Sequence, residues 1–97
     1  MRRGTTQTLT FTLPEEILID TLYITFAQHD VIVLEKTYDD VEINGKVISL
    51  PLSQEDTLCF TNGLVSVQLR IRDGEGHALA SGVKKFNVEP VLKEGVI

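Results

Sequence analysis

The sequence predicts an all-β protein built as an antiparallel β-sandwich. Several short segments alternate apolar and polar residues, and this period of two places successive side chains on opposite faces of a strand. Glycine, asparagine and aspartate separate these segments at short intervals. No long segment has the 3.6-residue period of an amphipathic helix. A small β-barrel is the alternative architecture that the same pattern allows.

Size and composition suit one domain with its own core. The chain has 97 residues, of which 42% are hydrophobic. We expect a single domain over residues 1–97, with residues 1–6 and 91–97 as flexible termini. The net charge of −5 argues against a nucleic-acid partner. The only basic pairs, Arg2-Arg3 and Lys84-Lys85, are expected to be solvated surface charges.

The first strand is predicted over Thr8–Leu13. Its apolar face consists of Leu9, Phe11 and Leu13, and threonines form the other face. Pro14 has no backbone N–H to donate to a neighbouring strand, so we expect the strand to end there.

The second strand is predicted over Asp20–Gln28, followed by a turn at His29-Asp30. A third strand over Val31–Lys36 begins with four consecutive apolar residues. Such a run is typical of a strand covered on both faces, or covered on one face by a partner. We expect Ile32 and Leu34 to lie in the core.

A second hairpin is predicted over Asp39–Leu52, with Asn44-Gly45 at its turn. Asn-Gly is the strongest two-residue hairpin signal, because a type I′ turn needs a positive φ at both central residues. The register that follows places Val41 opposite Ile48. The residues expected to share the apolar face are Val41, Ile43, Ile48, Leu50 and Leu52.

One helical turn is predicted over Ser53–Leu58, crossing from one sheet to the other. Ser53 is a suitable N-cap, and Asp56 three residues later completes a variant of the capping box. The segment is too short to be stable as an isolated helix.

The clearest hairpin runs from Leu64 to Val88, with its reversal at Asp73–Gly76. Its returning strand changes phase by one residue beside Gly82, which indicates a β-bulge or a strand that changes sheets. About seven strands and one helical turn favour an immunoglobulin-like sandwich, although the chain lacks the Cys-Trp-Cys core of antibody domains. The predicted core consists of Phe11, Leu22, Ile24, Phe26, Leu34, Ile48, Leu50, Val67, Leu69, Ile71 and Phe86.

The residue types that carry chemistry do not form a recognisable site, so we predict no catalytic, cofactor-binding or metal-binding residue. Both histidines, His29 and His77, fall in predicted turns without convergent partners. The carboxylate-rich turns do not match a calcium-binding loop. The residues weighed in these turns are Asp39, Asp40, Glu42, Asp73 and Glu75. Tyr23 and Tyr38 are expected to be half buried on a sheet face, and a ligand surface is the alternative.

Cysteine usage and segment hydropathy bear on location. Cys59 is the only cysteine, which excludes an internal disulfide, and its apolar neighbours predict a small buried side chain. The amino-terminal segment lacks the apolar stretch of a signal peptide, and no segment has the ~20 apolar residues of a membrane span. We expect a protein made in the cytoplasm, without membrane insertion.

Five segments carry a resemblance to a known group of proteins: Gly4–Pro14, Phe26–Gln28, Leu50–Leu58, Val67–Arg70 and Gly76–Ser81. In this order they resemble small immunoglobulin-like proteins encoded in prophages of Gram-positive bacteria, near tail and baseplate genes. The resemblance implies a virion-associated or assembly protein without enzymatic activity, and it carries no site residues.

The expected function is therefore a non-enzymatic structural or interaction module of a phage or prophage virion. Its expected partners are other phage structural proteins or further copies of the chain. Contact is expected through the uncharged edge of the Thr8–Leu13 strand, with Val91–Ile97 as a second contact. The alternatives are that this edge pairs internally, that the module binds a carbohydrate or surface, or that it is a small enzyme or metal-dependent protein.

Overall fold

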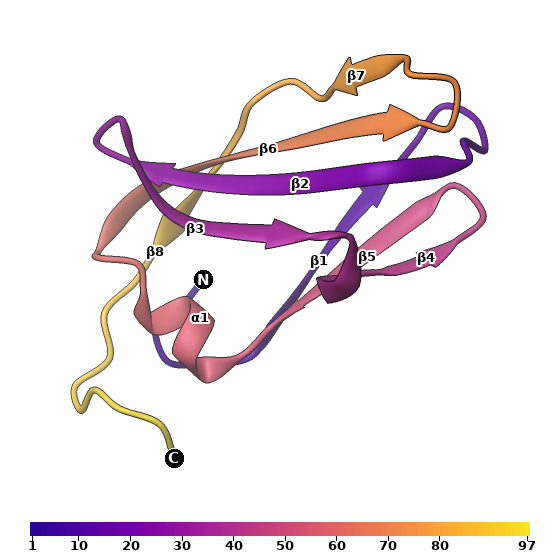
Figure 1. Ribbon diagram of the computed structural model, residues 1–97. Coiled ribbons are helices and arrows are strands. Elements are labelled where there is room, and N and C mark those ends of the chain that lie inside the picture. Colours follow the sequence, from indigo (N-terminus) through magenta and orange to yellow (C-terminus); the bar gives the residue numbers. More distant parts are fainter.

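A computed structural model describes residues 1–97 and shows two antiparallel sheets packed as a sandwich (Figure 1). The elements, in chain order, are β1 (Gln7–Thr12), β2 (Ile19–Gln28), β3 (Val31–Thr37), the 3-10 turn η1 (Tyr38–Asp40), β4 (Glu42–Asn44), β5 (Val47–Leu52), α1 (Gln54–Leu58), β6 (Gly63–Asp73), β7 (Ala78–Ala80) and β8 (Lys84–Val88). The chain is an all-β, immunoglobulin-like sandwich, as predicted. No helix is long and apolar enough to cross a membrane.

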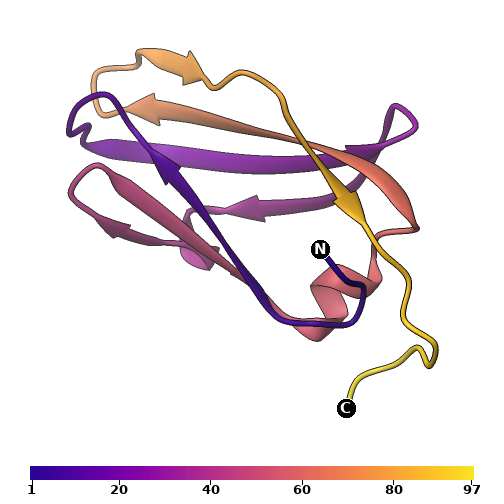
Figure 2. The same ribbon diagram turned by 180° about the vertical axis from the view of Figure 1, so that it is seen from behind.

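The smaller sheet has the strand order β1-β5-β4, and the larger has the order β3-β2-β6-β7, with β8 also paired to β6. Strands of the two sheets run obliquely to one another, and both chain ends lie near α1 (Figures 1 and 2). As predicted, α1 crosses between the sheets, because it joins β5 to β6.

The hairpin predicted over Leu64–Val88 is confirmed, and its returning strand is divided into β7 and β8. Ile71 pairs with Leu79 and Val65 pairs with Phe86, so the register shifts by one residue between the two strands. Both strands belong to the same sheet, and the phase change is therefore a bulge. Ser81 follows β7 and continues its bonding to β6. The Ser81 N–H donates to the Leu69 carbonyl, and the Ser81 hydroxyl accepts from the Leu69 N–H.

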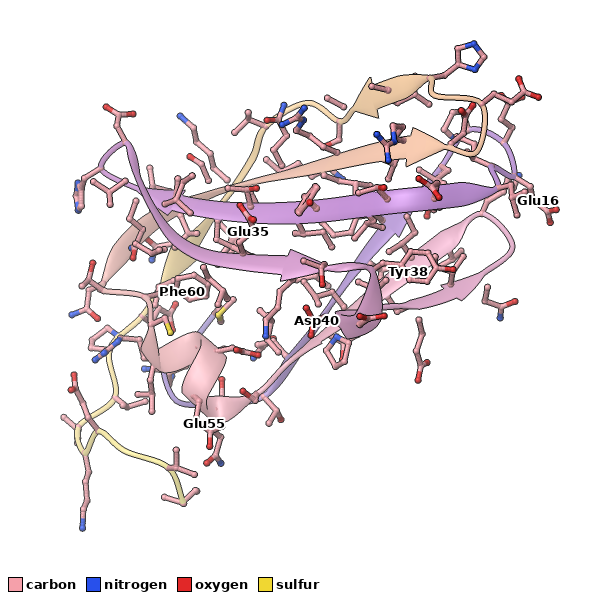
Figure 3. The ribbon with its side chains drawn as sticks, viewed as in Figure 1. Glu16, Glu35, Tyr38, Asp40, Glu55 and Phe60 are labelled. Atoms are coloured by element: carbon pink, nitrogen blue, oxygen red, sulfur yellow. The ribbon has the colours of Figure 1, made fainter.

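The core lies between the sheets and matches most of the prediction. Fourteen buried apolar residues form one cluster, against which the predicted core members Leu34 and Phe86 pack while partly exposed. The buried apolar residues absent from the predicted core are Leu13, Leu52, Phe60, Val65 and Val88. Phe60 lies at the α1 end of the molecule (Figure 3).

The prediction that Ile32 lies in the core is wrong. Its side chain is 62% exposed, because β2 and β3 pair with a bulge in β3. Phe26 pairs with Leu34, whereas the next residue, Ala27, pairs with Ile32, which leaves Val33 as the extra residue. The Leu34 side chain therefore points inward, as predicted, and the Ile32 side chain points outward.

The hairpin of β4 and β5 has a different register from the predicted one. Ile43 lies opposite Ile48, where Val41 was expected, and the two linking residues are Gly45 and Lys46. The slip is two residues, so the apolar residues keep their predicted face. The predicted positive φ at Gly45 is confirmed at 62°, whereas the φ of Lys46 is not positive. A positive φ at the first linking residue alone is typical of a type II′ turn.

The Gly45 conformation yields a stability prediction. Gly45→Val should lower the free energy of unfolding by about 1–2 kcal/mol, because a β-branched residue resists a positive φ. A Cβ at this position would also meet the Glu16 carboxylate at 3.4 Å. Denaturant unfolding measures the loss, with Gly45→Asn as the control because asparagine tolerates a positive φ. Equal stability of the two variants would contradict the assignment.

The capping prediction at α1 is confirmed in both halves. The Ser53 hydroxyl accepts from the Asp56 N–H at 3.1 Å, and the Asp56 carboxylate accepts from the Ser53 N–H at 2.9 Å. Thr57 faces the interior, where its hydroxyl donates to the Thr5 carbonyl at 2.8 Å. The turn is therefore fixed at its start and along its buried side.

The expectation that Arg2-Arg3 is solvated is wrong for Arg3. Its guanidinium donates to the Leu58 and Phe60 carbonyls at the end of α1 and pairs with Glu94. This contact satisfies carbonyls that a helix end leaves without partners. Arg2 forms a β-bridge with Glu89. Both chain ends thus contact the body of the domain, and their flexibility stays a prediction.

Candidate functional site

The outer edge of β1 is the one long strand edge without a charged residue. β5 is the only strand paired with β1. The segment Gly4–Pro14 has no charged side chain, whereas β3 carries Glu35 and Lys36, and β4 carries Glu42. Charged residues on an edge discourage pairing with another chain. Internal pairing with β5 therefore covers one side of β1 and leaves its other side open.

The free backbone groups of β1 can be assigned from its register. The Leu13 N–H donates to the Lys46 carbonyl at 2.8 Å, which continues the pairing of β1 with β5. Backbone bonding alternates along an antiparallel pair, so Phe11 and Leu9 face β5 in the same way. Thr8, Thr10 and Thr12 then direct their N–H and C=O groups outward. Pro51, which has no N–H, lies opposite Thr8, as this assignment requires.

An apolar groove of about 370 Å³ lies beside this edge, between the two sheets. Its apolar walls come from both layers and consist of Phe11, Leu13, Ile17, Leu69, Ile71 and Leu79, with Pro14 and Ala80 beside them. β7 has only three residues, and the chain leaves the ladder after Ser81. The groove therefore opens beside the end of this short edge strand, where the buried β6 residues Leu69 and Ile71 line it.

One cation lies at the groove. The Lys84 ammonium is 5.9 Å from the centroid of the Phe11 ring, within the range of a cation–π contact. Lys84 also lines the groove and has no carboxylate partner within the chain. The site thus combines free backbone donors and acceptors, apolar walls and one positive charge.

Neither histidine lines this groove. His29 is exposed in the β2–β3 turn, where it and Asp30 have φ values of 53° and 62°. His77 contacts the Asp73 carboxylate at 3.0 Å across the β6–β7 turn. Bonds from the His77 backbone, and further bonds from the His77 ring and the Glu75 N–H, hold the pKa of Asp73 below its usual range. Asp73 thus organises its own turn.

The other carboxylate-rich segment also bonds locally. Asp40 lies where β3 ends (Figure 3), and its carboxylate accepts from the Thr37 N–H at 2.9 Å. Asp39 and Glu42 are exposed. No three histidine, cysteine or acidic side chains converge in the way that a metal ion requires.

The remaining candidates lie on the surface. Tyr23 and Tyr38 are 42% and 46% exposed, as predicted for half-buried rings, but Tyr38 lies in η1 and not on a sheet face. The prediction of a buried Cys59 is wrong, since this residue is exposed at the end of α1 and its thiol contacts the Glu55 carbonyl. The helical period turns Thr57 and Phe60 inward and Cys59 outward, which the apolar neighbours in sequence did not reveal.

Comparisons with known proteins find a fold but no family. No family model matches the chain, and no curated protein is similar to it in sequence. The crystal structure of CopC from Methylosinus trichosporium OB3b is similar, with a TM-score of 0.62, 13% identity, and coverage of 97% of this chain and 87% of that one. The V domain of amphioxus IgVJ-C2 has a TM-score of 0.39 and 14% identity over 94% and 97% of the two chains. At this identity, the likeness to CopC concerns the fold alone.

Proposed function

We propose that the protein is a non-enzymatic interaction module of a phage or prophage virion, or of its assembly. It binds an extended segment of a partner along the outer edge of β1. The observation that carries this proposal is the open, uncharged edge of β1 beside an apolar groove. The partner is another phage structural protein or a second copy of the chain.

Strand addition uses both parts of the site. The outward N–H and C=O groups of Thr8, Thr10 and Thr12 supply main-chain hydrogen bonds to an added strand. Alternate side chains of that strand then point into the groove, since successive side chains leave a strand on opposite faces. The groove supplies selectivity for apolar residues, and Lys84 favours an acidic neighbour.

The virion role rests on the sequence resemblance. Gly4–Pro14, which contains the open edge, is one of the five segments that resemble prophage-encoded immunoglobulin-like proteins. A contact role requires no catalytic residue, and it accounts for a strand edge without charge. The tail over Val91–Ile97 offers a second contact, because Leu92 and Ile97 are fully exposed.

Proline at the edge tests the proposal. Thr10→Pro should weaken association at least about tenfold, because it removes an outward N–H without removing a bond to β5. Thr10→Val keeps that N–H and is the matched control, with binding expected within about twofold of the natural protein. Association is measured as solution mass at high micromolar concentration, and as co-sedimentation with particles purified from induced cells.

The two measurements separate the two kinds of partner. A Thr10→Pro defect in solution mass supports self-association, and a defect only in co-sedimentation supports a different virion protein. A natural protein that stays monomeric and does not sediment with particles would contradict the proposal. So would equal binding by both variants.

A further inference from the structure

A second hollow, of about 330 Å³, lies on the outer face of the larger sheet. Across the sheet, Tyr23 of β2 lies opposite Arg70 of β6, and Thr21 lies opposite Arg72. On the other side of β6, Arg72 lies opposite Ala78 of β7. The small alanine side chain beside long arginines opens the hollow. This site is separate from the groove at β1, and its function does not depend on the one proposed above.

The two arginines form a local positive charge on a chain whose net charge is −5. They are two residues apart on one face of a strand, so their Cα atoms are roughly 6–7 Å apart. Arg72 is held in place, because one of its terminal nitrogens donates to the Asp20 carboxylate at 3.0 Å and to the Thr21 hydroxyl at 3.1 Å. Its other nitrogens donate to no group of the chain.

Arg70 has no partner within the chain. Its guanidinium takes part in no hydrogen bond and no ion pair, and the residue is exposed. Two like charges at this spacing repel one another, and Asp20 offsets only the one on Arg72. An anion with two or more oxygens would bridge the free donors of both guanidiniums in the geometry that arginine favours.

The surroundings of the arginines suit a sugar ring. Tyr23 is 42% exposed, and the ring and hydroxyl of such a side chain offer an apolar surface with a polar end. The next residues on the same outer face are Thr25 and its partner Gln68. Gln68 donates to the Ser81 carbonyl through its side-chain nitrogen, so its side-chain oxygen stays free to accept. The outer face around the hollow is thus rich in hydrogen-bonding groups.

We propose that this hollow binds an acidic carbohydrate. The carboxylate of a sugar acid lies between Arg70 and Arg72, and the sugar ring lies against Tyr23. The hydroxyls of neighbouring sugar units bond with Thr25 and Gln68. A single aromatic ring gives modest affinity, so we expect a dissociation constant between about 0.1 and 1 mM.

Titration with trigalacturonate, followed by amide chemical shifts, tests the proposal. Shifts should cluster at β2, β6 and β7 around the hollow, and neutral galactotriose should bind at least about tenfold more weakly. Arg70→Gln should weaken trigalacturonate binding at least about tenfold. Arg70→Lys keeps the charge but not the planar donor pair. Its affinity for trigalacturonate should lie between those of the natural protein and Arg70→Gln.

Lys85→Gln is the matched control. Lys85 lies on the same outer face, opposite Ser66, and its substitution removes the same charge outside the hollow. Its binding should stay within about twofold of the natural protein. Equal losses in Arg70→Gln and Lys85→Gln would overturn the proposal, because they would show attraction by net charge alone.

Two further probes test the identity of the ligand. Inorganic phosphate should bind more weakly than trigalacturonate, because it has no ring to place against Tyr23. Hexaglutamate supplies carboxylates without sugars, and it should also bind more weakly. If either probe equals trigalacturonate, or if trigalacturonate does not bind, the assignment to a carbohydrate is wrong.

Discussion

Phe26→Ala should lower the free energy of unfolding by about 3–5 kcal/mol, the usual cost of truncating a fully buried aromatic side chain. Phe26 is completely buried, and its ring centroid lies 5.5 Å from that of Phe60 and 6.4 Å from that of Phe86. The rings of Phe60 and Phe86 lie 5.9 Å apart. Three segments, β2, the end of α1 and β8, therefore meet at Phe26, and a cavity there cannot be closed by one of them alone.

Denaturant unfolding of the purified chain measures this loss. Phe86→Ala is the control, because Phe86 belongs to the same ring cluster but is partly exposed. Its loss should be smaller, since less apolar area leaves water on folding. A loss below about 1 kcal/mol for Phe26→Ala, or a larger loss for Phe86→Ala, would contradict the central place given to Phe26.

The alternation of apolar and polar residues was sufficient to predict most core residues, but not the places where a bulge reverses the alternation. Leu22, Ile24 and Phe26 were predicted on one face of β2 and are all buried. Ile32 was placed wrongly because one inserted residue reverses the phase of a strand, and an unbroken apolar run conceals such an insertion. At β8 the phase change was visible, because polar residues and Gly82 interrupt the run.

The candidate sites depended on pairing that a single sequence does not contain. The absence of charge from Gly4 to Pro14 was visible and marked the open edge. The groove beside it brings Phe11 together with Leu69 and Leu79, which belong to the other sheet. The outer hollow likewise needs the register that places Tyr23 opposite Arg70. Neither the groove nor the outer hollow could be derived from the alternation of apolar and polar residues alone.

Asp56→Ala should lower the free energy of unfolding by about 2–3 kcal/mol, the second-largest loss that we expect from one substitution. The Asp56 carboxylate accepts from the Ser53 N–H and also pairs with the Lys36 ammonium at 2.9 Å. The side chains of Lys36 and Asp56 are only 18% and 16% exposed. Removing the carboxylate therefore leaves both a helix-start N–H and a poorly solvated ammonium without a partner.

Asp40→Ala separates these two losses. Asp40 caps the Thr37 N–H in the same way as Asp56 caps Ser53, but it is exposed and pairs with no lysine. Its removal should cost about 1 kcal/mol or less. If Asp40→Ala and Asp56→Ala destabilise the domain equally, the ion pair between β3 and α1 contributes nothing.

Acid should weaken the contribution of Asp56. Partial burial opposes ionisation of Asp56, but the Ser53 N–H and the Lys36 ammonium outweigh it and hold its pKa below the usual range. A carboxyl whose pKa is lower in the folded state stabilises the fold above its unfolded pKa of about 3.9, and that stabilisation is lost as the pH falls through the folded value.

Asp56→Asn keeps an oxygen for the Ser53 N–H but cannot ionise. Asp20 and Asp73, whose pKa values are also lowered, titrate in both proteins and cancel in the comparison. The difference in unfolding free energy between the natural protein and Asp56→Asn should therefore be constant above about pH 5 and shrink below about pH 4. A difference that stays constant down to pH 3 would show that the Ser53 N–H and Lys36 do not lower the pKa of this carboxyl.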